Sequence, residues 1–252
     1  MKKVPETDAI FDRLAEVNPA ADAAESMLRL SIDAKATIGL GLFSRGGYSR
    51  LTVKALDHDF APQQKVTPVG VFLPQYNELF LFLTTSRVTA DLLVDCLHQT
   101  WLLVTARFPQ VRTLLLNLDN GPENHSRRVG ELTSSRTQFM HRLTDLADHL
   151  NLTLELAYYP PYHSKYNPIE RVWGILEQHW NGSLLDSLQT VLNFARTMTY
   201  NGVPPVVEVV TRTYQTGVKL SQKAMAKLEN RFERLPGLEK YFVRIVPLSS
   251  LL

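Results

Sequence analysis

The chain has 252 residues, of which 44% are hydrophobic and 21% are charged, a composition typical of a folded globular protein rather than a disordered or fibrous one. No apolar run approaches the ~18 residues that a membrane span needs, and no apolar stretch follows the two N-terminal lysines, so we expect neither a membrane anchor nor a signal peptide. A single cysteine, Cys96, excludes a disulfide within the chain and favours a reducing cytoplasm.

The formal net charge is only +2, but the positive excess is confined to the last third of the chain. Residues 161–252 carry 11 Lys and Arg against 7 Asp and Glu, whereas residues 1–60 and 61–160 each carry 8 against 9. An excess of this sign favours a polyanionic partner for the last third. Solvated basic helix faces explain the same excess equally well.

The first part of the sequence predicts a helical segment followed by strands. Apolar residues recur at helical spacing from Ile10 to Val17, and Pro19 interrupts the pattern, so we expect one or two short helices within residues 7–25. Strand-like alternation then runs from Met27 to Ile32, with Asp33 at its end. Further strands are expected over 38–43, 51–55, 66–73 and 78–84, with turns over 45–48 and 74–77.

The second part alternates between helices and strands. A helix is expected from Thr89 to Arg107, with Cys96 on its apolar face as buried packing rather than as a nucleophile. The nearly continuous apolar run 113–118 is typical of a central strand covered on both faces. The remaining elements are expected in this order: a helix over 134–150, a strand over 152–158, a proline-rich loop, a helix from Pro168 to Trp180 and a helix over 184–200.

This order of elements predicts an α/β architecture. An antiparallel meander comes first and strands separated by helices follow it, so the sheet is mixed. The ribonuclease-H-like fold has the same strand order, which gives a five-stranded mixed sheet flanked by helices and a C-terminal helical or irregular extension. We therefore divide the chain into an N-terminal helical segment (1–26), a ribonuclease-H-like domain (27–202) and a basic C-terminal extension (203–252).

Three acidic residues stand at comparable positions in this arrangement. Asp33 ends the first strand, Asp119 ends the central strand, and Glu170 lies in the first turn of a later helix. In a ribonuclease-H-like sheet these two strands are neighbours, which brings the aspartates together beneath Glu170. Three carboxylates at one point repel one another unless cations neutralise them, and oxygen ligands select a hard ion such as Mg²⁺ or Mn²⁺. Two such ions about 3.5–4 Å apart can activate water or a hydroxyl in phosphodiester chemistry.

Each acid also has a purely structural explanation. Asn167 as N-cap and Glu170 three residues later would form a capping box, worth on the order of 1 kcal/mol. Asp119 before Asn-Gly is typical of a turn, and Asp33 of the end of a strand. Their shared placement in the fold favours the metal site over these alternatives.

Other polar and aromatic groups give weaker signals. Asp57-His58-Asp59 suggests a metal site, but the seven histidines have no ligand spacing, so zinc is not expected and Asp59 is only a candidate for substrate contact. Trp173 and Trp180 lie seven residues apart on one helix, which predicts that both pack in the core.

Four segments carry a further signal when they are taken together: Ser31–Lys35, Asp57–Phe60, Asn117–Gly121 and Pro160–Arg171. With Thr216–Ser221 near the C-terminus, they resemble a bacterial insertion-sequence transposase of the DDE type, similar to the ISAzo branch. The resemblance to mariner-like transposases and retroviral integrases is more distant. The match runs in order from about residue 8 to Pro247.

The resemblance implies that Asp33, Asp119 and Glu170 are the catalytic and metal-binding residues and that they hold two Mg²⁺ or Mn²⁺ ions. It implies DNA contacts for five further residues, which are Lys35, His163, Lys165, Asn167 and Arg171. The implied activity is metal-dependent cleavage of DNA at insertion-sequence ends, followed by transfer of the freed 3′-hydroxyl to target DNA. A homo-oligomer would hold both ends in a synaptic complex in the bacterial cytoplasm, associated with the nucleoid.

The sequence departs from the family pattern at two places. The family commonly has a second lysine after the Asp33-x-Lys pattern, where this chain has Ala36-Thr37. Members usually carry a long helix-turn-helix region before the catalytic domain, and 32 residues precede Asp33 here. We therefore expect the DNA-reading part to be encoded elsewhere or this copy to be truncated. The alternatives to a transposase are another metal-dependent nuclease of the same fold and an inactive remnant that only binds DNA or a partner.

Overall fold

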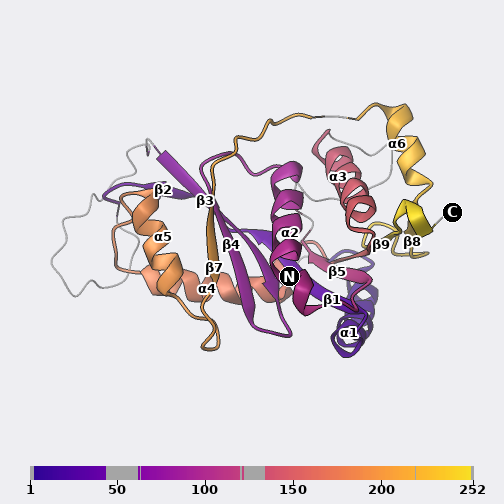
Figure 1. Cartoon of the computed structure of the whole chain (residues 1–252), viewed down its shortest axis with the longest axis horizontal. Coiled ribbons are helices and arrows are strands. Elements are labelled where there is room, and N and C mark those ends of the chain that lie inside the picture. Colours follow the sequence, from indigo (N-terminus) through magenta and orange to yellow (C-terminus); the bar gives the residue numbers. More distant parts are fainter. Residues whose placement is uncertain are drawn as a thin grey trace.

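The computed structural model describes residues 3–43, 62, 64–119, 121, 134–218 and 220–250. Figure 1 shows a sheet with helices packed beside it. The strands are β1 (Met27–Ala34), β2 (Ile38–Leu40), β3 (Gln64–Leu73), β4 (Glu78–Thr84), β5 (Thr113–Leu118), β6 (Thr153–Tyr158), β7 (Val206–Val210), β8 (Phe232–Arg234) and β9 (Phe242–Ile245). The α-helices are α1 (Thr7–Ala23), α2 (Ala90–Val104), α3 (Ser134–Leu150), α4 (Pro168–Trp180), α5 (Leu188–Thr197) and α6 (Gln222–Glu229). Three short 3₁₀ segments are η1 (Thr105–Arg107), η2 (Ser164–Tyr166) and η3 (Leu248–Ser250).

The strands form one mixed sheet in the order β7-β4-β3-β1-β5-β6-β9-β8, and β2 pairs with β3 beside this path. The expected hairpin of β3 and β4 is confirmed, and so is the placement of β5 beside β1; on its other side β5 pairs with β6. Both neighbours of β5 run parallel to it, and Ser31 of β1 lies opposite Asn117 of β5. Asp33 and Asp119, each two residues further along, therefore lie side by side at the carboxyl ends of β1 and β5.

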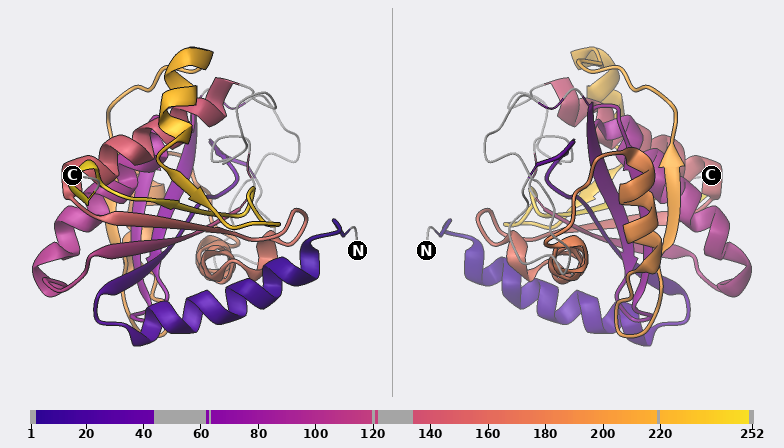
Figure 2. Two further views of the ribbon diagram at one scale, coloured as in Figure 1. Left: turned by 90° about the vertical axis from the view of Figure 1, so that its right-hand side faces the viewer. Right: turned by 90° about the vertical axis from the view of Figure 1, so that its left-hand side faces the viewer.

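The two faces of the sheet are covered by different helices. On β3, Val69, Val71 and Leu73 pack with α2, whereas Phe72 packs with α4 and α5. Because successive side chains of a strand point to opposite faces, α2 must lie on one face, with α4 and α5 on the other. Figure 2 shows this layering, with α1 running along the edge of the layer that contains α4. The sheet is thus buried on both sides around β1 and β5.

The interruption expected at Pro19 is absent, because α1 continues through it as one helix. Proline removes one backbone hydrogen bond from a helix interior. Tertiary contacts offset that loss: Ile10 and Ala21, on either side of the proline, are both buried. In addition, the Asn117 amide of β5 donates a hydrogen bond to the Asn18 side chain at 2.9 Å.

Among the described residues the sheet has nine strands rather than the five expected, because β2 pairs with β3 and residues beyond 202 add three strands at the edges. β7 pairs parallel with β4, β9 pairs antiparallel with β6, and β8 pairs with β9. These strands have only three to five residues each, too few for a clear alternating pattern. The segments expected over 45–48, 51–55 and 57–60 lie outside the described residues.

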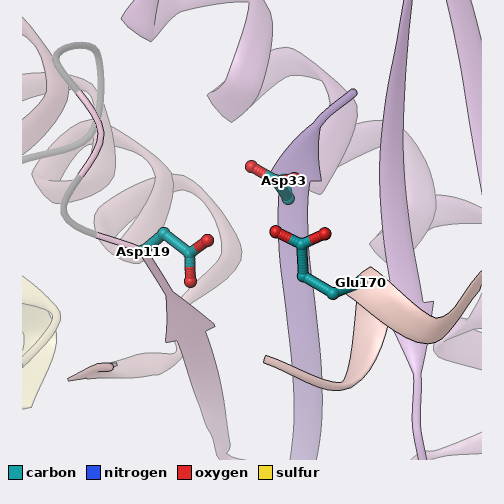
Figure 3. A group of neighbouring side chains, drawn as sticks. All are labelled: Asp33, Asp119 and Glu170. Carbon is teal, nitrogen blue, oxygen red and sulfur yellow. The ribbon is translucent and has the colours of Figure 1, made fainter. Parts of the chain in front are cut away.

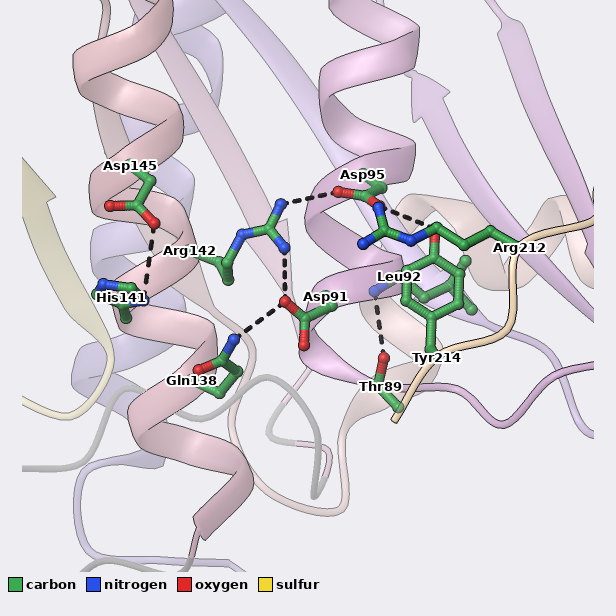
Figure 4. Close-up of polar contacts among 10 residues, drawn as sticks. All are labelled: Thr89, Asp91, Leu92, Asp95, Gln138, His141, Arg142, Asp145, Arg212 and Tyr214. Atoms are coloured by element: carbon green, nitrogen blue, oxygen red, sulfur yellow. Dashed lines mark hydrogen bonds and ion pairs between the residues drawn. The ribbon is translucent and has the colours of Figure 1, made fainter. Parts of the chain in front are cut away.

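A polar network fastens the segment after β7 across α2 (Figure 4). Arg142 of α3 donates hydrogen bonds to Asp91 at 2.5 Å and to Asp95 at 2.8 Å, which join α3 to α2. The second oxygen of Asp95 accepts from Arg212 and from the Tyr214 hydroxyl, both at 2.9 Å.

In the part of the chain that the structure describes, none of the helices combines the length and apolarity that crossing a bilayer requires.

Changing Gly70 to alanine should destabilise the protein, because β3 passes directly under α4 at this residue. A Cβ there would lie 2.6 Å from Cη2 of Trp173 and 2.8 Å from Cδ1 of Ile169. Overpacking of this kind costs about 1–3 kcal/mol of unfolding free energy, which urea denaturation measures. Gly174→Ala is the matched control. Nothing lies within 4 Å of a Cβ added at this helical position, so the unfolding free energy should rise by up to about 1 kcal/mol. Equal effects of the two changes would contradict the packing described here.

Candidate active site

Three carboxylates converge at the edge of the sheet where β1 and β5 end (Figure 3). Asp33 is the second-last residue of β1, Asp119 directly follows β5, and Glu170 lies in the first turn of α4. One carboxylate oxygen from each residue lies within 4.8 Å of the other two. The convergence predicted from the sequence is therefore present in the fold.

The loop before α4 places Glu170 over the two aspartates. Asn167 has extended backbone angles and Pro168 is the first helical residue, a position where its missing N–H costs no helical hydrogen bond. The Glu170 amide donates to the Asn167 carbonyl at 3.0 Å. The helix start at Pro168 is thus confirmed.

The capping box considered as an alternative for Glu170 is wrong, because the Asn167 side chain makes no capping hydrogen bond. Its amide nitrogen instead donates to Oδ1 of Asp119 at 3.0 Å, and its amide oxygen accepts from the Ser31 hydroxyl. Asn167 is 0% exposed. A side chain that would ordinarily cap α4 therefore connects the helix to both aspartate-bearing strands.

Trp173 has a role beyond the core packing expected for it. Its indole N–H donates a hydrogen bond to Oδ2 of Asp33 at 2.9 Å, and the residue is 4% exposed. Trp173 follows Glu170 by three residues, so the two side chains share one face of α4. That spacing is the sequence signal that would have linked Trp173 to the acidic site.

Burial and mutual repulsion make the cluster costly to ionise without a cation. Burial, with a smaller contribution from Glu170, raises the pKa of Asp33 to about 6, although the Trp173 hydrogen bond opposes the shift. Burial and then the charge of Asp33 raise the pKa of Asp119 to about 7 against the opposing hydrogen bond from Asn167. Among the described residues this is the only group of three or more potential metal ligands, and its all-oxygen donor set fits a hard divalent cation.

The five residues predicted to contact DNA fall into two groups. Lys165 and Arg171 are exposed, and the Lys165 ammonium lies 5.1 Å from the centre of the Tyr166 ring. Lys35 forms an ion pair with Glu177 at 2.7 Å, and Asn167 is fully buried. Lys165 and Arg171 are thus exposed, Lys35 is partly buried, and Asn167 and His163 are buried; DNA contact by any of the five stays a prediction.

His163 is 3% exposed, and α1 packs against it. The Phe11 ring meets His163 edge-on at 5.5 Å and Tyr166 edge-on at 5.0 Å between ring centres. Nδ1 of His163 lies 2.8 Å from the Pro161 carbonyl oxygen. The N-terminal helix thus supports the loop that leads to Glu170.

Cys96 is buried, and burial raises the pKa of its thiol, as expected for packing rather than for a nucleophile.

A mixed sheet of this order with three convergent carboxylates defines the ribonuclease-H-like class of metal-dependent nucleic-acid enzymes. A family model described as the Rhodopirellula transposase DDE domain matches residues 1–247. The chain belongs to this family of DDE transposases, whose members use divalent metal ions.

Solved structures of the Mos1 transposase are similar in fold. The Mos1 mariner paired-end complex with Mn is 12% identical, with a TM-score of 0.50 over 77% of this chain and 54% of that chain. The Mos1 paired-end complex with the left transposon end is 13% identical, with a TM-score of 0.49 over 75% and 52% of the two chains. This chain thus spans about half the length of the Mos1 chains that it matches. No curated protein matches the sequence.

Proposed function

We propose that this chain is a transposase catalytic domain that cuts DNA strands and joins them to target DNA, using two Mg²⁺ or Mn²⁺ ions held by Asp33, Asp119 and Glu170. The observation that carries the proposal is the meeting of three carboxylate oxygens within 4.8 Å in a member of the DDE family. The proposed catalytic domain is residues 27–202, with flanking segments 1–26 and 203–252.

In the proposed site some residues supply charge and others hold the charged side chains in place. Bound divalent ions would supply the Lewis-acid chemistry that makes a water or hydroxyl nucleophilic and stabilises the leaving oxygen. The three carboxylates supply the negative charge that holds such ions, and Trp173 and Asn167 restrain two of them. We propose that the exposed cations Lys165 and Arg171, which stand on either side of Glu170 in the sequence, contact phosphates.

The proposed reaction has two steps and no covalent enzyme intermediate. Water first attacks a phosphodiester at the element end and releases a 3′-hydroxyl. That hydroxyl then attacks a phosphodiester of the target, so one bond forms for each bond that breaks and no external energy source is needed. We further propose that homo-oligomers join two DNA ends in a synaptic complex and that the protein acts on the bacterial nucleoid in the cytoplasm.

The proposal is tested with the 252-residue chain, DNA duplexes carrying the two sequences that flank its gene, and a supercoiled plasmid as target. With Mg²⁺ or Mn²⁺ we expect cleaved ends and products that join a duplex to the plasmid, and with EDTA neither. Cleavage without joined products would instead support another nuclease of this fold. An absence of any metal-dependent cleavage would support the inactive remnant.

A further inference from the structure

We infer that Trp173 and Asn167 are positioning residues that hold Asp33 and Asp119 in the geometry required for metal binding. With Glu170 on the same helix, the first two turns of α4 then control all three carboxylates. The inference rests on the proposed function, because it assumes that the three acids bind the catalytic ions.

The indole of Trp173 is fixed by its surroundings before it meets Asp33. In the β1–β3 ladder Asp33 lies opposite Gly70, and the Trp173 ring packs over that glycine. A Cβ at Gly70 would lie only 2.6 Å from the ring, so the absence of a side chain there lets the indole reach the sheet. The ring is therefore seated directly beside the carboxylate that accepts its hydrogen bond at 2.9 Å.

That hydrogen bond restricts rotation of the Asp33 carboxylate. The carboxylate of an aspartate rotates about Cβ–Cγ over a broad range, because this terminal torsion has no narrow staggered wells. An N–H directed at Oδ2 therefore favours one orientation of the carboxylate. The Ala34 backbone also hydrogen-bonds to Asp33, but without the indole N–H more of the ordering of this carboxylate would fall to metal binding, which weakens the affinity.

Asn167 restrains Asp119 in the same way from the other side. Its amide nitrogen donates to Asp119 at 3.0 Å, and its amide oxygen accepts from Ser31, whose hydroxyl also accepts from the Ile169 amide at 3.3 Å. Ser31 and Asn167 are both 0% exposed, so water does not replace these bonds. The neutral amide offers a donor and an acceptor together, whereas an ionised carboxylate at this position could only accept.

These contacts join β1, the end of β5 and the start of α4 into one unit. Asn167, Glu170 and Trp173 all reach the two aspartates, Asn167 and Trp173 through hydrogen bonds and Glu170 through the carboxylate cluster. A displacement of α4 would consequently move one metal ligand and release the other two.

The test compares Trp173→Phe with Trp180→Phe in Mn²⁺ binding to the full chain, measured by calorimetry or electron paramagnetic resonance. Each change removes one indole N–H from a buried tryptophan of α4, but only Trp173 bonds to Asp33. Trp173→Phe should weaken Mn²⁺ binding about 10- to 100-fold, the usual effect of losing a group that orients a metal ligand. Trp180→Phe should leave the dissociation constant within about twofold, whatever it does to stability.

Plasmid nicking at increasing Mn²⁺ separates positioning from general destabilisation. Trp173→Phe should raise the Mn²⁺ concentration for half-maximal nicking while kcat at saturating Mn²⁺ stays close to that of the parent. Asn167→Leu is similar in size but has no donor or acceptor, so it should also raise the Mn²⁺ concentration for half-maximal nicking while kcat at saturating Mn²⁺ stays close to that of the parent. This second variant tests the inference if Trp173→Phe does not fold.

Parent-like Mn²⁺ affinity in both variants would overturn the inference and leave the proposed function standing. A parent that binds no Mn²⁺ would overturn both.

Discussion

Changing Asp119 to asparagine should abolish metal-dependent strand cleavage and, at the same time, stabilise the metal-free protein at pH 8. We expect nicking of a supercoiled plasmid in Mn²⁺ to fall by at least about 1000-fold, equivalent to about 4 kcal/mol of lost transition-state stabilisation. The stability gain arises because Asp119 is ionised at pH 8 although burial and Asp33 raise its pKa to about 7. Removing that charge should add on the order of 2–4 kcal/mol to the unfolding free energy in EDTA.

Asp148→Asn is the matched control, since it makes the same chemical change at a carboxylate of opposite character. Arg231 donates to both oxygens of Asp148, at 2.6 and 2.7 Å, and holds the pKa of this carboxyl below its ordinary value. Asp148→Asn should therefore lower stability at pH 8 and leave nicking unchanged. A variant Asp119→Asn that nicks as fast as the parent would show that Asp119 does not belong to the catalytic site.

Metal-free protein should lose stability as the pH rises from 5 to 8, and Mn²⁺ should restore it. A carboxyl whose pKa is higher in the folded than in the unfolded state contributes stability below the unfolded value of 3.8 and loses it as the pH passes the folded value. For Asp33 and Asp119 that loss extends to about 6 and about 7. Because the two charges are coupled, we expect a combined loss of about 2–5 kcal/mol, measurable by urea denaturation at each pH.

Divalent ions should act in the opposite direction. Metal binding requires ionised carboxylates, so saturating Mn²⁺ should stabilise the protein strongly at pH 8 and little at pH 5. At a concentration 100 times the dissociation constant, the gain at pH 8 is about 2.7 kcal/mol. In Asp119→Asn most of the pH dependence and most of the Mn²⁺ effect should disappear together. If metal-free protein were more stable at pH 8 than at pH 5, the three acids would not form the repulsive cluster described here.

The sequence was sufficient for the part of the fold that positions the acids. The continuous apolar run of β5 and the Asn-Pro start of α4 are local signals, and the strand order follows from connecting them. Pro19 predicts a break because its local effect is to interrupt a helix, whereas the packing that keeps α1 continuous depends on contacts distant in sequence. β7, β8 and β9 were missed because short edge strands owe their conformation to partners rather than to a pattern of their own.

The same distinction between local signals and contacts distant in sequence applies to the candidate site. Asp33, Asp119 and Glu170 were predicted because each ends or begins an element that the sequence marks. The hydrogen bond from Trp173 to Asp33 could not be predicted, because a buried tryptophan ordinarily packs in the core and its partner lies 140 residues away. The sequence around Asn167 predicts a helix cap or a DNA contact, whereas its bonds to Ser31 and Asp119 depend on how β1, β5 and α4 meet. Sequence thus identified the charges, and tertiary structure identified the groups that orient them.

The most direct test of the account is the stoichiometry of Mn²⁺ binding at pH 8 in the parent and in Asp33→Asn, Asp119→Asn and Glu170→Gln. Glu233→Gln, which changes an exposed acid on the distant strand β8, serves as the control. We predict two tightly bound ions in the parent and in the control, and loss of at least one in each of the three site variants. A parent that binds no Mn²⁺, or site variants that bind as the parent does, would contradict the assignment of these three carboxylates as the metal site.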